Sequence, residues 1–331
     1  MQAGQQGKKL RVLLLGQGLE LCRMAQWLTS HGHQVAGILT YPREEHQSND
    51  DEHRIEKREG LYADIFVEAE KLSLEIHESA NFNEPGVLQW VRDRQPDLAI
   101  SWRTRSILKR PFLDLFAGRI FNIHIGHLPH YQGSGAMSWM ILNGATGTAV
   151  VFHRMTPKID QGEMVGYFPF PVPPQAYPID IYREASRLIL ENFTRLLDPD
   201  IKPVHPENEE IPLKTSYFPR LKTMVHGVID WAWSPGEIER FIRAFGYPYA
   251  GAFALRDGER VHLARAEVVE VSPEKGFHPF CQGLVLAADP PTGSVVVVAG
   301  TGLLRIHTVR DGIDEIPATR RLRPGQRLMK A

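Results

Sequence analysis

The sequence has few of the features that mark several large classes of protein. It contains only two cysteines, Cys22 and Cys281, which lie far apart and form no C-x-x-C pair. A disulfide framework or a thiolate zinc site needs more cysteines or closer spacing, so the sequence argues against both. So little cysteine instead fits a reducing, cytoplasmic setting.

Long apolar runs and an excess of charge are also lacking. The first apolar run, residues 10–15, is too short for the core of a signal peptide or for a membrane span, so no membrane contact is expected. The 331 residues carry 38 basic and 39 acidic side chains, a net charge of −1. Proteins that mainly hold nucleic acid usually present a basic surface, so nucleic acid is not expected as the main partner.

The first half of the chain follows the pattern of an α/β fold. Short apolar runs predict strands, and segments with helical periodicity at 21–28 and 85–92 lie between them. The predicted strands are residues 10–15, 35–39, 98–102 and 120–124. We expect an open, mostly parallel, Rossmann-like sheet with helices on both faces. Ligands bind beyond the carboxyl ends of such strands, which directs attention to the residues after Leu15, Trp102 and His124.

The rest of the chain predicts a linker and a second domain. Residues 41–60 are polar and lack apolar rhythm, which indicates a surface loop, whereas 146–155 and 163–172 read as strands and 179–197 as a helix. A proline-rich stretch then separates a domain at 1–200 from one at 223–331, with the linker at 201–222.

The second domain is expected to be a small, OB-like β-barrel. Ser234 and Glu237 form a capping box that opens a helix ending near Ala244. Short strands with turn signals follow, which is the pattern of a small barrel. They are predicted at residues 260–264, 267–271, 283–287, 294–299 and 303–309.

Gly16-Gln17-Gly18 begins like a dinucleotide-binding fingerprint, but Leu21 stands where the third glycine belongs. No acidic residue follows the second strand to bind a ribose, since Thr40, Tyr41 and Pro42 come after Leu39. A tight turn from strand to helix is therefore the preferred interpretation, and this turn could still face a ligand.

The densest group of polar residues follows the fourth predicted strand. Asn122 and His124 alternate by two, so their side chains leave the strand on the same face. An amide and an imidazole side by side can polarise a carbonyl and move a proton, as acyl transfer to an amine requires. Taken alone, such a pair is more often structural, with the asparagine capping a turn and the histidine buried in the core.

Two further features near this pair admit a functional and a structural interpretation. His124, His127 and His130 recur every three residues, but Gly126 and Pro129 interrupt any helix that would gather them, so no metal site is expected. Asp160 lies in a loop between two predicted strands, where aspartate usually serves the turn. If that loop folds beside His124, the carboxylate would instead orient the imidazole and favour its protonated form.

Together these residues form a pattern that resembles a known family. Asn122-x-His124, then Leu128-Pro129-x-Tyr131-x-Gly133, then Ile159-Asp160-x-Gly162 is similar to the formyltransferases that use 10-formyltetrahydrofolate. Ile229-Asp230-Trp231 and the stretch 248–253 resemble the start of the family's carboxyl-terminal barrel domain. The resemblance covers the chain from about Leu10 to Leu328.

The resemblance implies an enzyme and assigns roles to its residues. Asn122 and His124 would bind the formyl oxygen, His124 would handle the amine proton, and Asp160 would orient His124. The donor, released as tetrahydrofolate, would contact the loops after the fourth strand and before the aspartate, at Trp102, Arg103, Ser106, Ile107, Leu108, Thr156, Ile159 and Asp160. The acceptor is expected to meet Gln17, His127, Tyr131, Gln132 and Gly133. His127 departs from the family's Ser-Leu-Leu-Pro pattern and would place a titratable group near the entrance of the site.

The acceptor is harder to assign. Family members that act on initiator methionyl-tRNA resemble one another in a basic insertion after the second strand, but here residues 43–58 hold four basic and six acidic side chains. Residues 201–331 include 17 basic and 15 acidic residues, so the second domain does not present a strongly basic surface for tRNA. Tyr217 and Tyr247 lie in stretches closer to the branch that acts on nucleotide-linked amino sugars, so a sugar nucleotide is the expected acceptor. Methionyl-tRNA and a hydroxylated amino acid such as hydroxyornithine stay open as acceptors.

Many members of the family that this sequence resembles form dimers through the second domain, so a homodimer is a further possibility. No interface patch is evident in this sequence.

Overall fold

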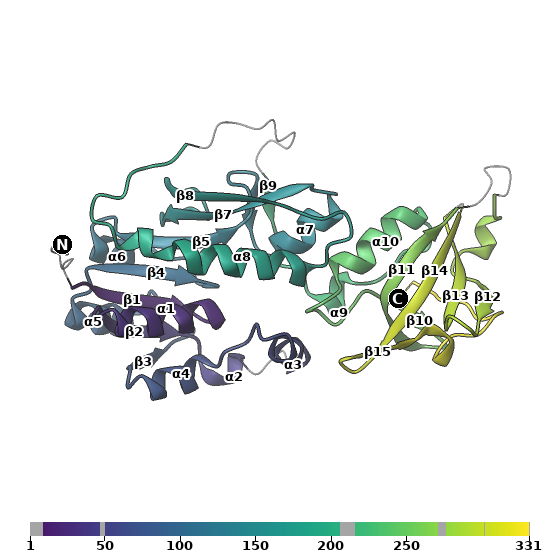
Figure 1. Ribbon diagram of the computed structural model, residues 1–331, viewed down its shortest axis with the longest axis horizontal. Helices are drawn as coiled ribbons and strands as arrows, with labels where there is room; N and C mark the ends of the chain where they lie inside the picture. The colour runs from purple at the N-terminus through teal and green to yellow at the C-terminus, as the bar shows by residue number, and fades with distance from the viewer. Residues whose placement is uncertain (1–8, 47–49, 206–215, 271–275, 301, 331) are drawn as a thin grey trace, which may run out of the picture.

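The computed structural model describes residues 9–46, 50–205, 216–270, 276–300 and 302–330, with side chains from residue 54 onward in the segment that begins at 50. An α/β domain and a smaller β-rich domain lie side by side along the long axis of the molecule (Figure 1). Within the described residues, no helix combines the length and apolarity needed to cross a membrane.

The first domain is built on a seven-stranded sheet in the order β3-β2-β1-β4-β5-β7-β8. Its first five strands are parallel, and β7 and β8 add to one edge as antiparallel strands. The strands are β1 (Arg11–Gly16), β2 (Gln34–Thr40), β3 (Ile76–Glu78), β4 (Leu98–Trp102), β5 (Ile120–Ile125), β7 (Gly147–Arg154) and β8 (Met164–Pro171). The expectation of an open, mostly parallel sheet is confirmed.

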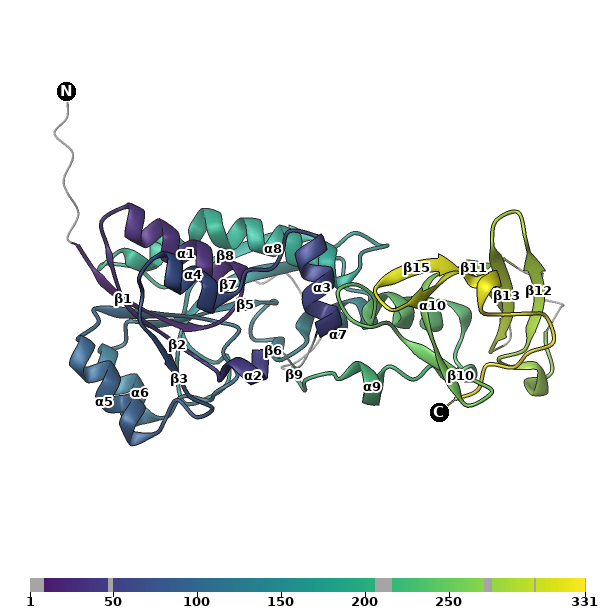
Figure 2. The same cartoon turned by 90° about the horizontal axis from the view of Figure 1, so that it is seen from below.

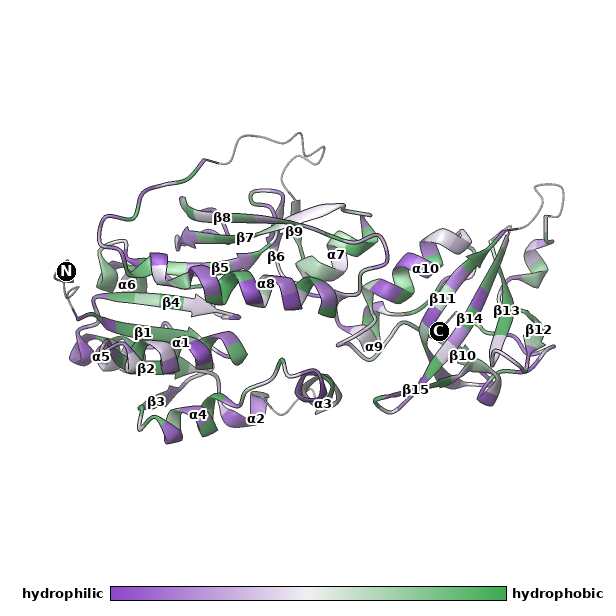
Figure 3. Cartoon of the chain, in the orientation of Figure 1, coloured by the Kyte–Doolittle hydropathy of each residue, from purple (hydrophilic) through white to green (hydrophobic). Residues whose placement is uncertain are grey.

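Helices cover both faces of this sheet because successive residues of each strand point to opposite sides. Val12 and Leu14 of β1 pack with α1 (Leu19–Ser30) and α8 (Pro178–Asn192), whereas Leu13 and Leu15 pack with α5 (Pro85–Arg94) and α6 (Arg110–Leu113). Figures 1 and 2 show these helices on either side of the strands, and Figure 3 shows apolar residues concentrated along the strands. Two apolar layers therefore hold the strand ends in place.

The prediction of a loop at 41–60 was wrong. The described part of this segment forms α2 (Arg43–His46) and α3 (Asp50–Arg58), while residues 47–49 lie outside the described residues. Ile55 is the only apolar residue of α3, so the sequence had no apolar periodicity to reveal it. Contacts with distant parts of the chain hold this helix instead, such as Arg58 with Tyr247 and Glu56 with Arg103.

Other elements of the first domain also escaped prediction. They are short or form between distant segments, which leaves little local signal. They comprise β3, α4 (Ile65–Lys71), β6 (Tyr131–Gly133), α7 (Ala136–Leu142) and β9 (Ser216–Phe218). The pair β6 and β9 joins the first domain to the segment expected as a linker, of which residues 206–215 lie outside the described residues.

The second domain contains an antiparallel sheet in the order β10-β11-β14-β13-β12, with β15 paired to β14. The expected capping box opens α10 (Pro235–Ala244), where Ser234 Oγ accepts from the backbone N–H of Glu237. The strands are β10 (Phe253–Arg256), β11 (Glu259–Val269), β12 (Val285–Asp289), β13 (Ser294–Ala299), β14 (Gly302–Asp311) and β15 (Asp314–Pro317). The expected small barrel-like domain is confirmed.

One strand of this sheet had been predicted as two. Residues 260–264 and 267–269 belong to the single strand β11, and residue 271 lies outside the described residues. Its pairing with β14 shifts register around Arg265, which interrupts the alternation of inward and outward residues. A bulge of this kind looks like a strand end in the sequence.

Candidate active site

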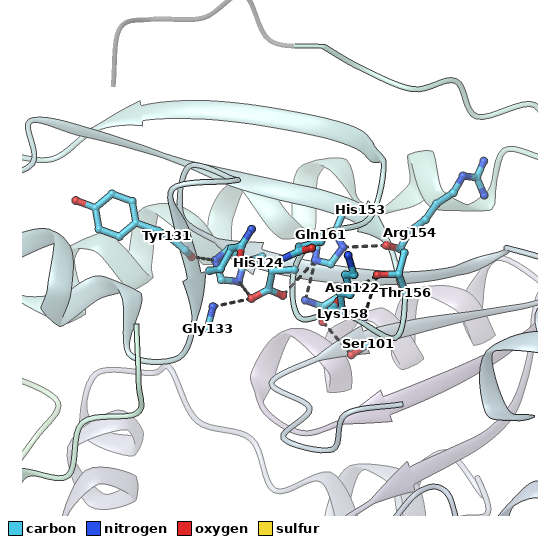
Figure 4. A network of polar contacts seen from close by, with 12 residues as sticks. Ser101, Asn122, His124, Tyr131, Gly133, His153, Arg154, Thr156, Lys158 and Gln161 are labelled. Carbon is cyan, nitrogen blue, oxygen red and sulfur yellow. Dashed lines mark hydrogen bonds and ion pairs between the residues drawn. The ribbon is translucent and has the colours of Figure 1, made fainter. Parts of the chain in front are cut away.

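The residues of the sequence motif meet at the carboxyl end of β5, between β4 and β7. Asn122 and His124 lie on β5, and Asp160 lies in the turn between β7 and β8. The Nδ1 atom of His124 is 3.7 Å from Oδ2 of Asp160. Figure 4 shows the asparagine and histidine side chains within one network of polar contacts. The structure therefore brings together the three residues that the sequence singled out.

His124 is buried, with 8% of its surface exposed, and its two ring nitrogens have different surroundings. Nε2 lies 2.6 Å from the backbone carbonyl of Tyr131. A carbonyl only accepts, so Nε2 carries a proton and Nδ1 is the unprotonated nitrogen of the neutral ring. Burial lowers the pKa of His124 below its ordinary value, aided by the nearby His153 and opposed by Asp160 and the Tyr131 carbonyl. His124 therefore offers a neutral Nδ1 on the side facing the carboxylate.

Asp160 is held in one orientation by contacts on both of its oxygens. Oδ2 accepts from the backbone N–H of Gly133 at 2.8 Å, and Oδ1 lies 3.5 Å from Nε2 of His153. Burial, the largest influence, favours the neutral acid, but His153, His124 and the Gly133 amide together hold the pKa of Asp160 below its ordinary value. The carboxylate is therefore ionised beside a neutral imidazole.

The Asp-x-Gly part of the motif has a steric reason. Asp160 has φ of 49°, in the left-handed region that non-glycine residues seldom adopt. A Cβ on Gly162 would lie 1.5 Å from the carbonyl oxygen of Arg154, so only glycine lets the turn fold against the end of β7. The turn's close approach to β7 is what carries the aspartate to His124.

His153 is a site residue that the sequence reasoning missed. It lies directly opposite Asn122 in the antiparallel pairing of β5 and β7 and is only 2% exposed. Its Nδ1 is 3.0 Å from the carbonyl of Arg154, and its Nε2 is 3.2 Å from Nδ2 of Asn122. A strand was expected at 146–155, but only the register with β5 could have placed His153 beside the asparagine.

The amide of Asn122 is oriented from two sides. Ser101, at the end of β4, donates its hydroxyl to Oδ1 at 2.9 Å. Nδ2 faces His153 with one of its two N–H groups. The second N–H is the group that can donate to a reacting carbonyl.

The residues expected after β4 divide into buried and exposed ones. Trp102 and Leu108 are buried, and the indole of Trp102 donates to Glu20 at 2.8 Å. The Ser106 backbone N–H donates to the Tyr41 hydroxyl, whereas the side chain of Ile107 is 55% exposed. Direct side-chain contact with a ligand is therefore available to Ile107 and not to Trp102 or Leu108.

The same loop holds two polar groups of interest. Arg103 pairs with the buried Glu56 at 3.4 Å rather than with Asn122, His124 or Asp160, which are called the triad from here on. Thr104, which the sequence reasoning did not select, has a buried hydroxyl with no hydrogen-bond partner among the described residues. An unsatisfied buried hydroxyl in an otherwise ordered loop indicates a group that a ligand could satisfy.

The loop before Asp160 is closed by its own hydrogen bonds. The hydroxyl of Thr156 accepts from the Lys158 N–H at 3.3 Å and lies 3.1 Å from the Lys158 carbonyl, to which it donates. Ile159 is half-buried beside the aspartate. Thr156 thus shapes the turn, and the backbone edge of this turn borders the triad.

The residues expected to meet the acceptor do not all reach the triad. Tyr131, Gln132 and Gly133 form β6 beside it, linked through the Gly133 N–H to Asp160. His127 is buried, and its Nδ1 lies 2.6 Å from the Tyr167 hydroxyl on β8, so its ring is not at an open entrance. Gln17 follows β1, and its backbone N–H donates to the Trp102 carbonyl.

In the part of the chain that is described, no group of three or more His, Cys, Asp or Glu could hold a metal.

Comparison with known families agrees with this arrangement. Residues 8–186 match the model described as formyl transferase, and residues 223–322 match the formyl transferase C-terminal domain. The chain belongs to the formyl transferase family. This is the family that the sequence motifs resemble.

Several solved structures share the fold of this chain. HypX from Aquifex aeolicus is 19% identical with a TM-score of 0.60, and the match covers 95% of this chain and 48% of HypX. The sugar 3N-formyl transferase WlaRD is 16% identical, with coverage of 91% and 97% and a TM-score of 0.61. An N-formyltransferase from Helicobacter canadensis is 14% identical, with coverage of 90% and 98% and a TM-score of 0.59. The chain thus spans about half the length of HypX.

Proposed function

We propose that this enzyme transfers a formyl group from 10-formyltetrahydrofolate to the amine of a nucleotide-linked amino sugar. The observation that carries the proposal is the geometry of three side chains: the buried His124 lies 3.7 Å from the Asp160 carboxylate, and the oriented amide of Asn122 lies on the same strand as His124. These are the groups needed to polarise a formyl oxygen and to take a proton from an attacking amine.

The transfer needs a proton acceptor and an oxyanion donor. The acceptor's nitrogen attacks the formyl carbon and loses a proton, while the bond between that carbon and the donor's nitrogen breaks and the leaving nitrogen is protonated. His124 Nδ1 takes the proton of the amine, and the 3.7 Å gap to Asp160 then closes to a charge-assisted contact. Asn122 donates to the developing oxyanion, a contact worth about 3 kcal/mol by analogy with other acyl transfers.

The loops flanking the triad fit a folate donor, which supplies an activated formyl carbon. Ile107 offers an exposed apolar side chain, and the unpartnered hydroxyl of Thr104 lies in the same loop. A pterin ring has apolar faces and a polar edge and would use both. Relatives support a folate donor, since structures of HypX with tetrahydrofolic acid and of the Helicobacter canadensis enzyme with folinic acid have been solved.

Two observations support a sugar nucleotide as acceptor. The WlaRD structure contains dTDP, and the Helicobacter canadensis enzyme is in complex with dTDP-3-aminofucose. In this chain, Tyr217 on β9 is 60% exposed, and its ring carbons lie 3.0–3.1 Å from where a Cβ on Gly133 would be. Because the Gly133 amide binds Asp160, this exposed ring is next to the catalytic carboxylate, where it can stack on a sugar or base.

The test supplies 10-formyltetrahydrofolate with separate acceptors and follows release of tetrahydrofolate. The panel contains 3-amino and 4-amino sugar nucleotides, hydroxyornithine and methionyl-tRNA, with the Asn122→Ala enzyme as the inactive control. We expect release with an amino sugar nucleotide. Release with methionyl-tRNA or hydroxyornithine alone would overturn the choice of acceptor, and no release with any would overturn the proposed activity.

A further inference from the structure

A cavity of about 410 Å³ lies beside the start of α1, outside the triad. Its walls come from the turn after β1, from α2 and α3, from the start of α4 and from the loop after β4. Four cationic side chains line it, namely Arg43, Arg54, Lys57 and Arg103. The segment 43–58, which the sequence alone marked as acidic, contributes Arg43, Arg54, Glu56 and Lys57 to this lining, and residues 61–66 contribute the largest share.

Both carboxylates in the described lining are already engaged. Asp64 caps α4, where it accepts from the Phe66 N–H at 2.9 Å and the Val67 N–H at 3.4 Å. Glu56 is only 4% exposed and pairs with Arg103 at 3.4 Å. Glu45 from the same segment binds Arg105 at 2.7 Å and does not line the cavity. In the described lining, four cations therefore stand against two carboxylates, and each of these carboxylates already has a hydrogen-bond or ion-pair partner.

Aromatic rings position two of these cations. The Arg43 guanidinium lies 4.1 Å above the ring of Phe66, and the Lys57 ammonium lies 4.7 Å from the ring of Tyr62. A cation held over a ring keeps its N–H groups available at the edge, where they can donate to an anion. The stacked cations are therefore placed without consuming the donors that an anionic ligand would need.

The turn after β1 adds neutral polar groups. Gly18 precedes α1 with φ of 104° and has no side chain to cap the helix, so the first backbone N–H groups of α1 point toward the cavity wall that Gly18 and Leu19 form. Gln17 also lines the cavity, and the N–H groups of its side-chain amide are donors. Donors of this kind add directional hydrogen bonding to the charge.

The wall formed by α3 is held by the second domain. Arg58, at the end of α3, donates to the Tyr247 hydroxyl at 2.9 Å and pairs with Asp314 at 3.4 Å. Figure 2 shows α3 facing the second domain. The cations of α3 are therefore fixed relative to the sheet even though the helix has almost no apolar face.

Gln17, which lines the cavity, and Asn122 of the triad belong to strands that are two places apart in the sheet. Gln17 follows β1, Ser101 ends β4, and Asn122 is on β5, three adjacent strands of the sheet. Two spacings between neighbouring strands amount to about 10 Å. A hexose bridges most of that distance between an amine on its ring and the phosphates on its anomeric carbon.

We propose that this cavity binds the diphosphate of the acceptor, with Arg43, Arg54, Lys57 and Arg103 as its cationic contacts. The inference rests on the proposed function, because it assigns the substrate's anionic part to the cavity and its amine to the triad. The summed charge of 43–58 argued against phosphate as a ligand. The side chains that line the cavity carry more positive than negative charge, which favours it.

The test measures binding separately from catalysis. Calorimetry with dTDP, UDP and inorganic pyrophosphate uses the full chain without formyl donor, comparing wild type with Arg54→Gln and Lys57→Gln. Both residues are exposed, and melting temperatures check that the variants fold. The matched control is Arg92→Gln, an exposed arginine on α5 outside the cavity. We expect Kd for a nucleoside diphosphate to rise at least tenfold in the two variants and to stay unchanged in the control.

Steady-state kinetics then separate this proposal from the proposed function. With an amino sugar nucleotide, both variants should raise KM at least tenfold and leave kcat within twofold. Transfer with unchanged KM and Kd would overturn the diphosphate site and leave the proposed function standing. Variant-sensitive binding of a nucleoside diphosphate without formyl transfer would sustain the site and overturn the function. Binding of methionyl-tRNA that depends on Arg54 and Lys57, with no binding of any nucleoside diphosphate, would also overturn the site.

Discussion

Replacing His153 by phenylalanine tests whether this histidine positions the catalytic amide. Phenylalanine fills a similar volume but loses the contacts to Asn122, to the Arg154 carbonyl and to Asp160. Each lost hydrogen bond to a buried partner costs about 1–3 kcal/mol. If about 1.4–2.8 kcal/mol of that loss is felt in the transition state, kcat falls by about 10- to 100-fold.

The expected kinetic pattern is specific to a positioning role. Because His153 touches Asn122 and Asp160 rather than the loop with Ile107, KM for the formyl donor should change less than threefold. Steady-state kinetics with saturating acceptor measure both constants. His153→Gln retains one amide donor and one acceptor and should recover part of the lost kcat.

A second histidine provides the control for stability. His262 also binds a backbone carbonyl, that of Gly251 at 2.8 Å, but it lies in the second domain away from the triad. His262→Phe should lower the melting temperature without lowering kcat. A kcat for His153→Phe within twofold of wild type, at full folding, would refute the positioning role.

Three further outcomes are expected. Asn122→Ala should lower kcat by about 10²–10³-fold and change both KM values little, since its amide acts on the oxyanion; an equal rise in KM would point to ground-state binding. Burial lowers the pKa of His124 below its ordinary value of about 6.5, so the ring is still neutral at pH 6.5. We therefore expect kcat to stay constant as the pH falls to 6.5 and to decline only at lower pH. A midpoint above pH 7 would contradict this. Tyr217→Ala should raise acceptor KM about tenfold, the scale of one base-stacking contact, whereas Tyr217→Phe should not.

Local sequence patterns were sufficient for much of the fold. The apolar runs located β1, β2, β4 and β5, and the limits of β13 were predicted as the structure has them. The Ser234–Glu237 capping box located the start of α10. These elements are set by interactions within a few residues or by continuous burial, and both leave a visible pattern.

Elements that depend on distant partners left no such pattern. The three-residue pair of β6 and β9 joins Gln132 to Tyr217, and neither segment has the length to read as a strand. In α3, Arg58 reaches Tyr247 and Glu56 reaches Arg103, so contacts far along the chain replace the apolar periodicity that usually identifies a helix.

The sequence by itself was sufficient to predict the fold class and the family and to select Asn122, His124 and Asp160 as candidate site residues, because motif spacing and apolar runs are local properties. Tertiary structure alone decided that His153 stands opposite Asn122, since strand register is set by pairing between distant segments. It also decided which side chains of 43–58 line the cavity, because a summed charge does not say where each side chain points; among the described side chains these are Arg43, Arg54, Glu56 and Lys57. The direction in which a side chain points and the register of two paired strands are both set by the folded structure, and the chemistry proposed for this site depends on both.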